Sequence, residues 1–488
     1  MLILKYNTLS ADDLFVVERR FLRWLDNKGP VINPDFNILN CARTDVYGHL
    51  LGLLAKLKVL DTLGIDASQM LDFLIDVDAA YLDAPYHSFY HAVDIVTVLY
   101  YMLTELVAVR YLSPLDVAAL LLSALCHDAG HPGYTNLYQV NCNTPLAKKY
   151  NNTSVLESYS VEIGQDLLRK HKLLKSLESH EQRQFLKKFE NMILSTDMVY
   201  HYELQEQLGS LEELVTYIMW LDADDTSDAD SLLWDMSWCS DNDNDSNTVG
   251  DGCSNSSYSV PDDEGLLLDE SQRQSLCRIL LHAADISNTV RPWPVSKQWS
   301  DLIVQEFFRQ GDAEKAAGLE VSPGMDREHA SQPTISLKFG DFVVKPYFEA
   351  LASVLPAGHV FLDHLARNRE EWIRLKDYPT VTDAVSPPPP LAYHERQFPV
   401  SLLPAQPVPN PTGRRVSVPA GLVVIPDRQY YHPPQPRRQS ARHTGFRSTS
   451  HSTLRQVNND MMDFFFYRRK SEQICNYNDA FFEPPMVI

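Results

Sequence analysis

The segment of residues 113–128 reads SPLDVAALLLSALCHD and limits the possible folds more than any other part of the chain. Its start favours a helix, because Ser113 can cap the first turn, Pro114 suits the first helical position and Asp116 completes a capping-box-like pattern. The run Val117–Leu125 is apolar on all sides, which is typical of a helix buried in the middle of a bundle. A chain that contains such a helix has to surround it with other elements.

The rest of the pattern is helical as well. Residues 1 to about 220 show little β signal, and HLLGLLAKLKVLDTL places its apolar residues at helical spacing. Proline and glycine fall mostly between such runs. Helical patterning resumes at Asp269 and ends near Asp377. We therefore predict an all-α fold, a compact multi-helix bundle, within a main domain of residues 1–380.

Two segments differ in composition from this domain. Residues 222–265 are rich in Ser, Asn and Asp, and no Lys or Arg occurs between Lys188 and Arg273. Such a segment buries too little surface to offset its ordering entropy, so we predict a disordered acidic insertion. Residues 381–488 begin near an SPPPP sequence and carry repeated proline, which predicts a disordered tail rich in Pro, Arg and Ser.

The tail contains Arg-Arg-x-Ser twice, ending at Ser417 and at Ser440. These sequences are typical of substrates of a basophilic kinase. Chance in a tail rich in Arg and Ser explains them equally well, and both explanations stay open.

The net charge of −21 argues against a nucleic-acid partner, because binding to a polyphosphate needs basic stripes. A small anionic substrate is compatible with this charge if metal ions neutralise it. The most apolar stretch, residues 95–125, is interrupted by Glu105, Arg110 and Asp116, so we expect no membrane span.

The start of the chain, MLILKYNTLSADDL, has no basic leader and no long apolar core. Seven cysteines form no CxxC pair and are too few for a disulfide framework. They are typical of free thiols in a reducing compartment, so we expect a cytoplasmic protein, with a nuclear location also compatible.

The first of three motifs is YHSFYHAVD, residues 86–94. His87 and His91 stand four residues apart, so a helix would present both on one face. Alone, such a pair is more typical of a structural role than of a metal site.

The second motif is CHDAGHPGYTN, residues 126–136. His127 and Asp128 place a nitrogen ligand beside a carboxylate that can bridge two divalent ions, at the end of the buried helix. His131 lies one turn on, and the Pro-Gly that follows is expected to end the helix. Burying these groups costs several kcal/mol unless they are paired or metal-bound.

The third motif is LHAADISN, where Asp285 ends a helix with a buried stripe. A single carboxylate at this position is usually a cap, and it becomes a candidate ligand only together with the other motifs. His91, His127, Asp128 and Asp285 then supply two imidazoles and two carboxylates. This set suits a zinc-like ion, with a second, harder ion such as Mg²⁺ or Mn²⁺ sharing one aspartate. A hydroxide bridging two metals can attack phosphorus in line.

Together these motifs resemble the class I 3′,5′-cyclic-nucleotide phosphodiesterases, a branch of the HD-type metal hydrolases. The patterns Y-H-x-x-x-H-A-x-D, H-D-x-x-H-P-G-x-x-N and A-D-I-S-N occur in that family's order. The similarity continues through RPWPVSKQW and EFFRQGDAEKAAGLEVSP and covers roughly residues 35–375 without the insertion. The residues of the segment YHSFYHAVDIV are most similar to those of the fungal high-affinity cAMP phosphodiesterase branch.

The resemblance implies a helical bundle of the HD/phosphodiesterase type and a role for each matching residue. His91, His127, Asp128 and Asp285 would bind the first metal, and Asp128 would bridge to the second. His87 would be the general acid that protonates the O3′ leaving group, with Glu306 as its orienting partner. The residues expected to hold the metal-bound waters are His131, Asn136, Glu157 and Thr196. The residues expected to bind the substrate's base are Tyr86, Asn288, Ile303, Phe307, Ser336 and Phe339.

One position departs from the family's pattern. Where the family carries a glutamine that reads the purine edge, alignment on Phe339 places Ser336. The nearest glutamine, Gln332, lies four residues earlier. Either the helix start is shifted and Gln332 serves, or Ser336 reads the base less specifically.

We predict hydrolysis of a 3′,5′-cyclic nucleotide to the 5′-monophosphate, with cAMP preferred over cGMP. The fungal-like wording and the two Arg-Arg-x-Ser sequences motivate the choice of cAMP. One alternative is another HD-type nucleotide phosphohydrolase, which the extended matches disfavour. The other is an inactive scaffold acting through the acidic insertion and the tail, which would be expected to lack a metal ligand, and none of the four is missing.

Overall fold

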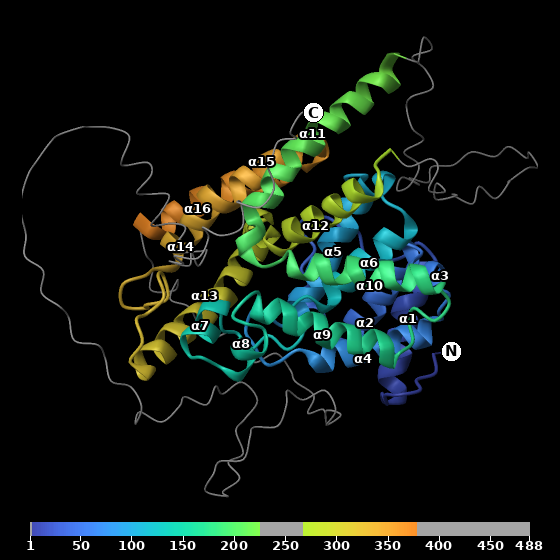
Figure 1. Ribbon diagram of the computed structural model, residues 1–488, viewed down its shortest axis with the longest axis horizontal. Helices are drawn as coiled ribbons and strands as arrows, with labels where there is room; N and C mark the ends of the chain where they lie inside the picture. The colour runs from blue at the N-terminus through green and yellow to red at the C-terminus, as the bar shows by residue number, and fades with distance from the viewer. Residues whose placement is uncertain (1, 225–266, 378–488) are drawn as a thin grey trace, which may run out of the picture.

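The computed structural model describes residues 2–224 and 267–377 (Figure 1). All regular elements in these ranges are helices, which confirms the all-α prediction. Helix α11 extends to Asp224, three residues into the segment predicted as an insertion. The remainder of that segment, the tail and both Arg-Arg-x-Ser sequences lie outside the described residues.

The first half of the fold consists of shorter helices. They are α1 (Ala11–Leu25), α2 (Arg43–Lys56), α3 (Val59–Leu63), α4 (Ala67–Ala80), α5 (Phe89–Thr104), α6 (Pro114–Cys126), α7 (Asn136–Asn141), α8 (Pro145–Lys149), α9 (Val155–Lys170) and α10 (Ser179–Leu194). The second half contains α11 (His201–Asp224), α12 (Glu270–Asp285), α13 (Trp293–Ala317), α14 (Gln332–Phe339), α15 (Lys345–Val354) and α16 (His359–Asp377).

Helix α6 is the predicted central helix. The Ser113 side chain accepts a hydrogen bond from the Asp116 backbone, the Asp116 side chain accepts one in return, and Pro114 stands in the first turn, as the sequence predicts. The run Val117–Leu125 is buried throughout. Helices α5, α10 and α12 surround it. The burial of this helix follows directly from its lack of a polar face.

An ionic cluster joins the same helices. The buried Asp116 carboxylate accepts from Lys188 of α10 at 2.6 Å and from Arg273 of α12 at 2.8 Å. Burial alone would raise the pKa of Asp116, but the two cations and Ser113 hold that pKa below its usual value. This network ties the beginnings of α6 and α12 together, so their far ends are held in register.

Helix α1 packs against α2 at close range. A Cβ added at Gly52 of α2 would lie 2.1 Å from Cγ of Trp24, so only glycine allows this approach. The segment predicted as helical across residues 49–63 is divided, because Lys58 takes a left-handed conformation with φ of 57°. It therefore forms the end of α2 and the whole of α3.

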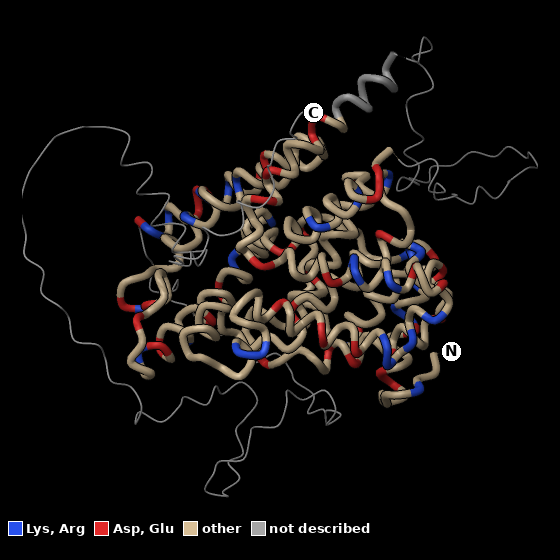
Figure 2. The backbone as a smooth tube through the Cα atoms, in the orientation of Figure 1, with Lys and Arg blue, Asp and Glu red and all other residues tan. Residues whose placement is uncertain are grey.

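In Figure 1, α11 lies beside α15, and α13 crosses toward the end of the molecule where α7 lies. Acidic and basic residues, coloured on the backbone tube of Figure 2, alternate along the described helices. None of the described helices combines the length and the apolar character needed to cross a bilayer.

Candidate active site and metal cluster

Three helix ends meet at one place in the fold. His91 lies in the first turn of α5, whose cap is Ser88. Helix α6 ends at Cys126, so His127 is its C-cap residue and Asp128 follows directly. Asp285 is the last residue of α12. The packing of α5 and α12 against α6 brings these three ends together.

The expected helical spacing of His87 and His91 is wrong. Ser88 has extended backbone angles and caps α5, which begins at Phe89. His87 therefore precedes the helix, and its ring approaches that of His91 edge-on at a centroid distance of 6.0 Å. A change of backbone direction at the cap, rather than a shared helix face, brings the two rings together.

The four expected metal ligands form one cluster. His91 Nε2 lies 3.1 Å from Asp285 Oδ1 and 3.8 Å from Asp128 Oδ2. His127 Nε2 lies 3.0 Å from Asp128 Oδ2 and 3.6 Å from Asp285 Oδ1. Both histidines are buried, and the two aspartates are more than three-quarters buried.

The chemistry of this cluster fits a divalent cation. His127 Nδ1 lies 2.9 Å from the Ala124 carbonyl, which can only accept, so Nδ1 carries the proton. The lone pair of Nε2 then faces Asp128 and Asp285, and this buried atom makes no hydrogen bond of acceptable geometry. A bare lone pair opposite two carboxylates is unfavourable without a positive charge between them. Two imidazoles and two carboxylates are ligands that Zn²⁺ accepts.

The electrostatics point the same way. Burial opposes the charged form of His127, but Asp128 and Asp285 outweigh it and raise its pKa well above the ordinary value. Burial would also raise the pKa of Asp285, yet the adjacent imidazoles of His127 and His91 hold that pKa well below the usual range. The site therefore attracts positive charge, whether it comes from a proton or from a metal ion.

His87 forms a short contact with Glu306 of α13. His87 Nδ1 lies 2.6 Å from Glu306 Oε2, while Glu306 Oε1 accepts from the backbone N–H groups of Tyr86 at 2.7 Å and of His87 at 3.0 Å. Burial lowers the pKa of His87, but the Glu306 carboxylate, with Asp128 and Asp285, outweighs burial and raises it to about 9. The Glu306 side chain is 3% exposed, and His87, whose side chain is 23% exposed, lines the cavity described below.

His131 lies in a turn rather than in a helix, because α6 has already ended five residues earlier. The expectation that the Pro-Gly sequence ends the helix is therefore wrong. This sequence lies in the turn that follows the helix. The His131 ring stacks on His87 at 3.9 Å, and its Nδ1 accepts from the Gly133 N–H. Arg309 of α13 donates to the carbonyls of Pro132 and Gly133 and so stabilises this turn.

A second group of carboxylates borders the cluster. Asn136 donates to both oxygens of Glu157 at 3.1 and 2.9 Å, and Ser154 donates to Asp197 at 2.8 Å. Burial, and then the charge of Asp197, raise the pKa of Glu157 well above its usual value. A cation bound near Glu157 and Asp197 would stabilise their ionised forms. The sequence motifs indicate the adjacent Thr196 but not Asp197, although the same STDMVYH segment contains both.

The cluster opens into a cavity of about 600 Å³. Its wall contains all the residues that the sequence predicts to bind the base, namely Tyr86, Asn288, Ile303, Phe307, Ser336 and Phe339. The Asn288 side chain donates to the Tyr86 hydroxyl. Gln332, the alternative reader of the base, is buried and does not belong to the lining. Ser296 and Ser300 do line the cavity and were not selected from the sequence.

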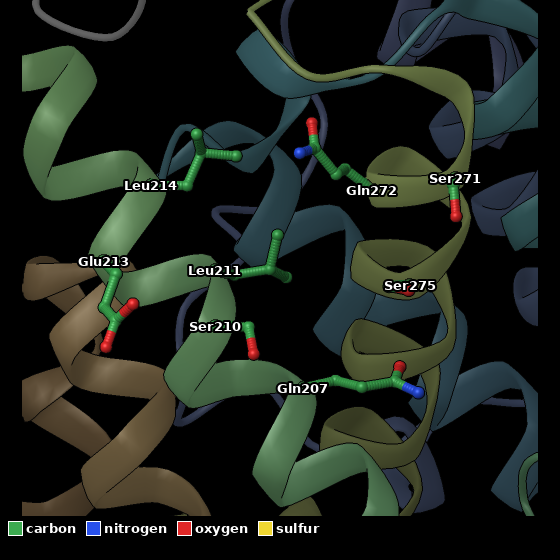
Figure 3. Close-up of a pocket in the computed structure, with 8 residues that line it drawn as sticks. All are labelled: Gln207, Ser210, Leu211, Glu213, Leu214, Ser271, Gln272 and Ser275. Atoms are coloured by element: carbon green, nitrogen blue, oxygen red, sulfur yellow. The ribbon is translucent and has the colours of Figure 1, made fainter. Parts of the chain in front are cut away.

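A second hollow lies between α11 and α12, with a volume of about 480 Å³ (Figure 3). Gln207 and Ser210 line it from α11, and Ser271, Gln272 and Ser275 line it from α12. It contains no histidine and only one carboxylate among the lining residues, so it lacks the chemistry of the larger cavity.

Comparison with known proteins agrees with this geometry. A protein-family model described as 3′5′-cyclic nucleotide phosphodiesterase matches residues 86–365. The chain belongs to this family. The matched region runs from the motif that contains His87 to helix α16, so it includes every residue of the cluster and the cavity wall on α13 and α14.

The names of curated relatives refer to cyclic nucleotides in general, to cAMP or to cGMP. The 3′,5′-cyclic-nucleotide phosphodiesterase regA of Dictyostelium discoideum is 28% identical over 71% of this chain and 38% of its own length. The probable 3′,5′-cyclic-AMP phosphodiesterase pde-4 of Caenorhabditis elegans is 29% identical over 65% and 41%. The high affinity cGMP-specific 3′,5′-cyclic phosphodiesterase 9A of Mus musculus is 28% identical over 70% and 55%. The chain thus spans between about two-fifths and just over half of these relatives.

A solved structure has the same fold. The phosphodiesterase domain of the rhodopsin phosphodiesterase from Salpingoeca rosetta is 25% identical and superimposes with a TM-score of 0.58. The match covers 72% of this chain and 94% of that domain. The resemblance read from the motifs is thereby confirmed at the level of the family.

Proposed function

We propose that this chain hydrolyses a 3′,5′-cyclic nucleotide to the 5′-monophosphate, with cAMP preferred. The observation that carries the proposal is the position of the His87–Glu306 pair beside the two-histidine, two-aspartate cluster, at the wall of a cavity with an apolar slot. A proton donor and a cation site would both assist the opening of a cyclic phosphodiester, and an apolar slot would hold the base; residues proposed for all three roles line this one cavity.

His91, His127, Asp128 and Asp285 would hold the first metal, for which we propose Zn²⁺. Asp128 would also reach a second ion, Mg²⁺ or Mn²⁺, whose waters His131, Asn136, Glu157 and Thr196 would orient. Two such ions supply an activated water and neutralise the charge that develops on the phosphate.

His87 would act as the general acid. Its Nδ1 is engaged by Glu306, so the Nε2 proton is the one available to the cavity. As the bond from phosphorus to O3′ breaks and a bond from phosphorus to the water oxygen forms, this proton would go to O3′. Glu306 would keep the imidazolium form populated near neutral pH, as the raised pKa of His87 indicates.

Several side chains would hold the base at a fixed distance from the phosphate. Phe339 of α14 and Ile303 of α13 are only partly buried and line the cavity, as expected for apolar surfaces that face a purine. Tyr86 and Asn288 are hydrogen-bonded to each other at the same wall. This slot favours a cyclic nucleotide over the pyrophosphate or non-nucleotide substrates of other HD hydrolases.

The preference for cAMP is supported by the fungal-like motif wording and by the two Arg-Arg-x-Ser sequences. If a cAMP-dependent kinase phosphorylates Ser417 and Ser440, a rise in cAMP would lead to phosphorylation of the enzyme that hydrolyses it, which is a feedback loop. We propose a cytoplasmic location, with the nucleus as the alternative. The four cysteines that the described ranges contain are free thiols, which fits a reducing compartment.

Turnover of cAMP and cGMP by the purified chain, in the presence of Mg²⁺ or Mn²⁺, tests the proposal. Equal or faster turnover of cGMP would contradict the cAMP preference, and no turnover of either would favour the scaffold. Asp285→Ala should reduce kcat by more than the roughly 10–100-fold that loss of an outer-shell partner causes. Asp166→Ala is the matched control, because that aspartate forms an ion pair with Arg169 on the surface of α9. Full activity of the Asp285 variant would refute the metal assignment.

A further inference from the structure

The end of helix α4 contacts the end of helix α6 and the turn that follows it. Tyr81 directly follows α4 and is buried. Its hydroxyl donates to the Leu125 carbonyl at 3.0 Å and accepts from the Asp128 N–H at the longer distance of 3.4 Å. The carbonyl of the preceding residue, Ala80, accepts from the Gly130 N–H at 2.9 Å. Two consecutive residues of α4's end therefore contact this region of the chain at three points.

The last carbonyls of α6 show what the tyrosine contributes. An α-helix leaves its final carbonyls without a partner inside the helix. The Ala124 carbonyl lies 2.9 Å from His127 Nδ1, and the Cys126 carbonyl accepts from a backbone N–H of the following turn at 3.1 Å, so both have local partners. The Leu125 carbonyl between them is satisfied by Tyr81, which lies 44 residues earlier in the chain.

The Tyr81 hydroxyl serves both of its hydrogen bonds at once. A carbonyl can only accept and a backbone N–H can only donate, so the hydroxyl has to donate to Leu125 and to accept from Asp128. Burial, and then the charge of Asp128, raise the pKa of Tyr81 well above its ordinary value. The hydroxyl therefore keeps its proton through the neutral pH range, and the link between α4 and α6 persists there.

We propose that Tyr81 is a positioning residue for the metal-binding pair His127–Asp128, because its hydroxyl lies between the end of α6 and the Asp128 N–H and fixes the backbone that carries both ligands. This proposal rests on the proposed function, since it assumes that the pair binds the first metal. Tyr81 acts through the backbone, and it does not belong to the lining of the cavity.

The backbone of this turn matters because it carries two of the four expected ligands. His127 Nε2 lies 3.0 Å from Asp128 Oδ2, so a rotation of the turn would displace both ligands together, relative to those on α5 and α12. Loss of a partner that orients a metal ligand weakens metal binding by about 10–100-fold. We expect the lower end of that range, about tenfold, because the hydrogen bond between Ala80 and Gly130 remains when the hydroxyl is removed.

The test is Tyr81→Phe, which keeps the ring that packs edge-on against Phe89 at 6.0 Å and removes the hydroxyl. The full chain is freed of metal with a chelator, and Zn²⁺ is then titrated in competition with a chromophoric chelator of known affinity. The apparent Kd for Zn²⁺ should rise about tenfold. With Mg²⁺ in excess, the Zn²⁺ concentration for half-maximal turnover should rise by the same factor, while kcat at saturating Zn²⁺ and KM for the cyclic nucleotide stay within about twofold.

Tyr347→Phe is the matched control. The buried Tyr347 hydroxyl donates to the Ile279 carbonyl of α12 at 3.1 Å, so this variant loses the same kind of hydrogen bond at a distance from the ligand that ends α12. Both variants should lower the melting temperature of the metal-free chain, but only Tyr81→Phe should weaken Zn²⁺ binding. An equal fall in Zn²⁺ affinity in the two variants would indicate a general loss of stability and overturn the proposal.

Ser160→Ala is a second variant of the same turn, for use if Tyr81→Phe does not fold without metal. Ser160 of α9 donates to the Ala129 carbonyl, directly after Asp128, at 3.0 Å. If the backbone of this turn governs metal affinity, loss of this bond should weaken Zn²⁺ binding by about two- to tenfold, the equivalent of one neutral hydrogen bond. An unchanged affinity in that experiment would overturn the proposal.

The titration also separates this proposal from the proposed function, because Zn²⁺ binding is measured without substrate. A chain that binds Zn²⁺ and hydrolyses neither nucleotide would refute the proposed function, and the change in Kd would still decide the role of Tyr81. An unchanged Kd in Tyr81→Phe, in a chain that hydrolyses a cyclic nucleotide, would overturn the positioning role alone. Absence of Zn²⁺ binding by the unmodified chain would overturn both.

Discussion

Replacing Glu306 by glutamine removes one negative charge from the proposed general acid while keeping the shape of the site. The Gln oxygen can still accept from the backbone N–H groups of Tyr86 and His87, as Oε1 does now. The Gln nitrogen would face His87 Nδ1, which would then have to accept instead of donate. The imidazolium form of His87 thereby loses its nearest anion, which lies 2.6 Å away.

The size of the effect can be worked out from the groups around His87. Burial by itself lowers the pKa of this histidine, and Glu306 is the largest of the charges that raise it to about 9. Bound cations would neutralise the contributions of Asp128 and Asp285, which leaves Glu306 as the main support of the protonated form. Removing an opposite charge at this distance shifts a pKa by about 1–3 units, here toward acid.

The assay is the pH dependence of kcat/KM from about pH 5.5 to 9.5. Below both pKa values the variant and the unmodified enzyme should have similar rates, and above both the variant should be slower by about 10–1000-fold, because each unit is one factor of ten. Glu314→Gln is the matched control: it is a buried glutamate of the same helix, bonded to Ser322, away from His87. A loss that is equal at all pH values would refute the role of Glu306 in the titration of His87.

Two further predictions concern stability. His201 Nδ1 and His282 Nε2 lie 2.9 Å apart, and burial lowers their pKa values to about 3 and about 4, so both take up protons more readily when unfolded. The neutral pair therefore contributes its full stabilisation above pH 6.5 and loses it as the pH falls toward 4. At pH 5 the free energy of unfolding should be lower by about 4 kcal/mol than at neutral pH, which urea unfolding at pH 5 and 7.5 measures. A variant with both histidines replaced by leucine should show a smaller difference between the two pH values. Gly52→Ala should reduce the free energy of unfolding by about 1–3 kcal/mol, because the added methyl group overpacks Trp24. Gly209→Ala on α11, where an added Cβ would have no atom of the described ranges within 4 Å, should be neutral or slightly stabilising. Equal melting temperatures for the two variants would contradict this packing argument.

The sequence predicts the central helix α6 well because the features that determine its bounds and its burial are local. The cap at Ser113, the proline after it and the absence of a polar face are local properties, and each has one structural meaning. The cluster of candidate metal ligands is predictable for a related reason. His127 and Asp128 directly follow a buried helix, and Asp285 ends another, so their chemistry would be costly there without a cation.

What could not be predicted depends on contacts between distant segments. The four-residue spacing of His87 and His91 fits a helix, and only the extended backbone at Ser88 shows that the helix begins after the first of them. Asp197 becomes recognisable when Ser154 and Glu157 are seen beside it, some forty residues earlier in the chain. The stacking of His131 on His87 likewise depends on a turn that Arg309 holds from another helix.

Helix α13 shows why the base pocket is the hardest part to read from sequence. Ser296, Ser300, Ile303 and Phe307 follow one another at spacings of four, three and four, so one stripe of this helix lines the cavity. A stripe of this kind predicts a buried face but not what that face contacts, because isoleucine and phenylalanine at helical spacing are also typical of a helix that packs in a core.

The role of this face of α13 becomes clear only from the residues that it contacts at each end of the stripe. Near its start, Ser300 meets Ser336 and the Gln332 amide, which gives the wall a polar group suited to a base edge. Six residues later, about 9 Å along the axis, Glu306 contacts His87 and the backbone of the loop that carries it. A single rigid helix therefore sets the distance between the group that would read the purine and the group that would protonate O3′, and that distance is a property of the assembled fold rather than of any motif.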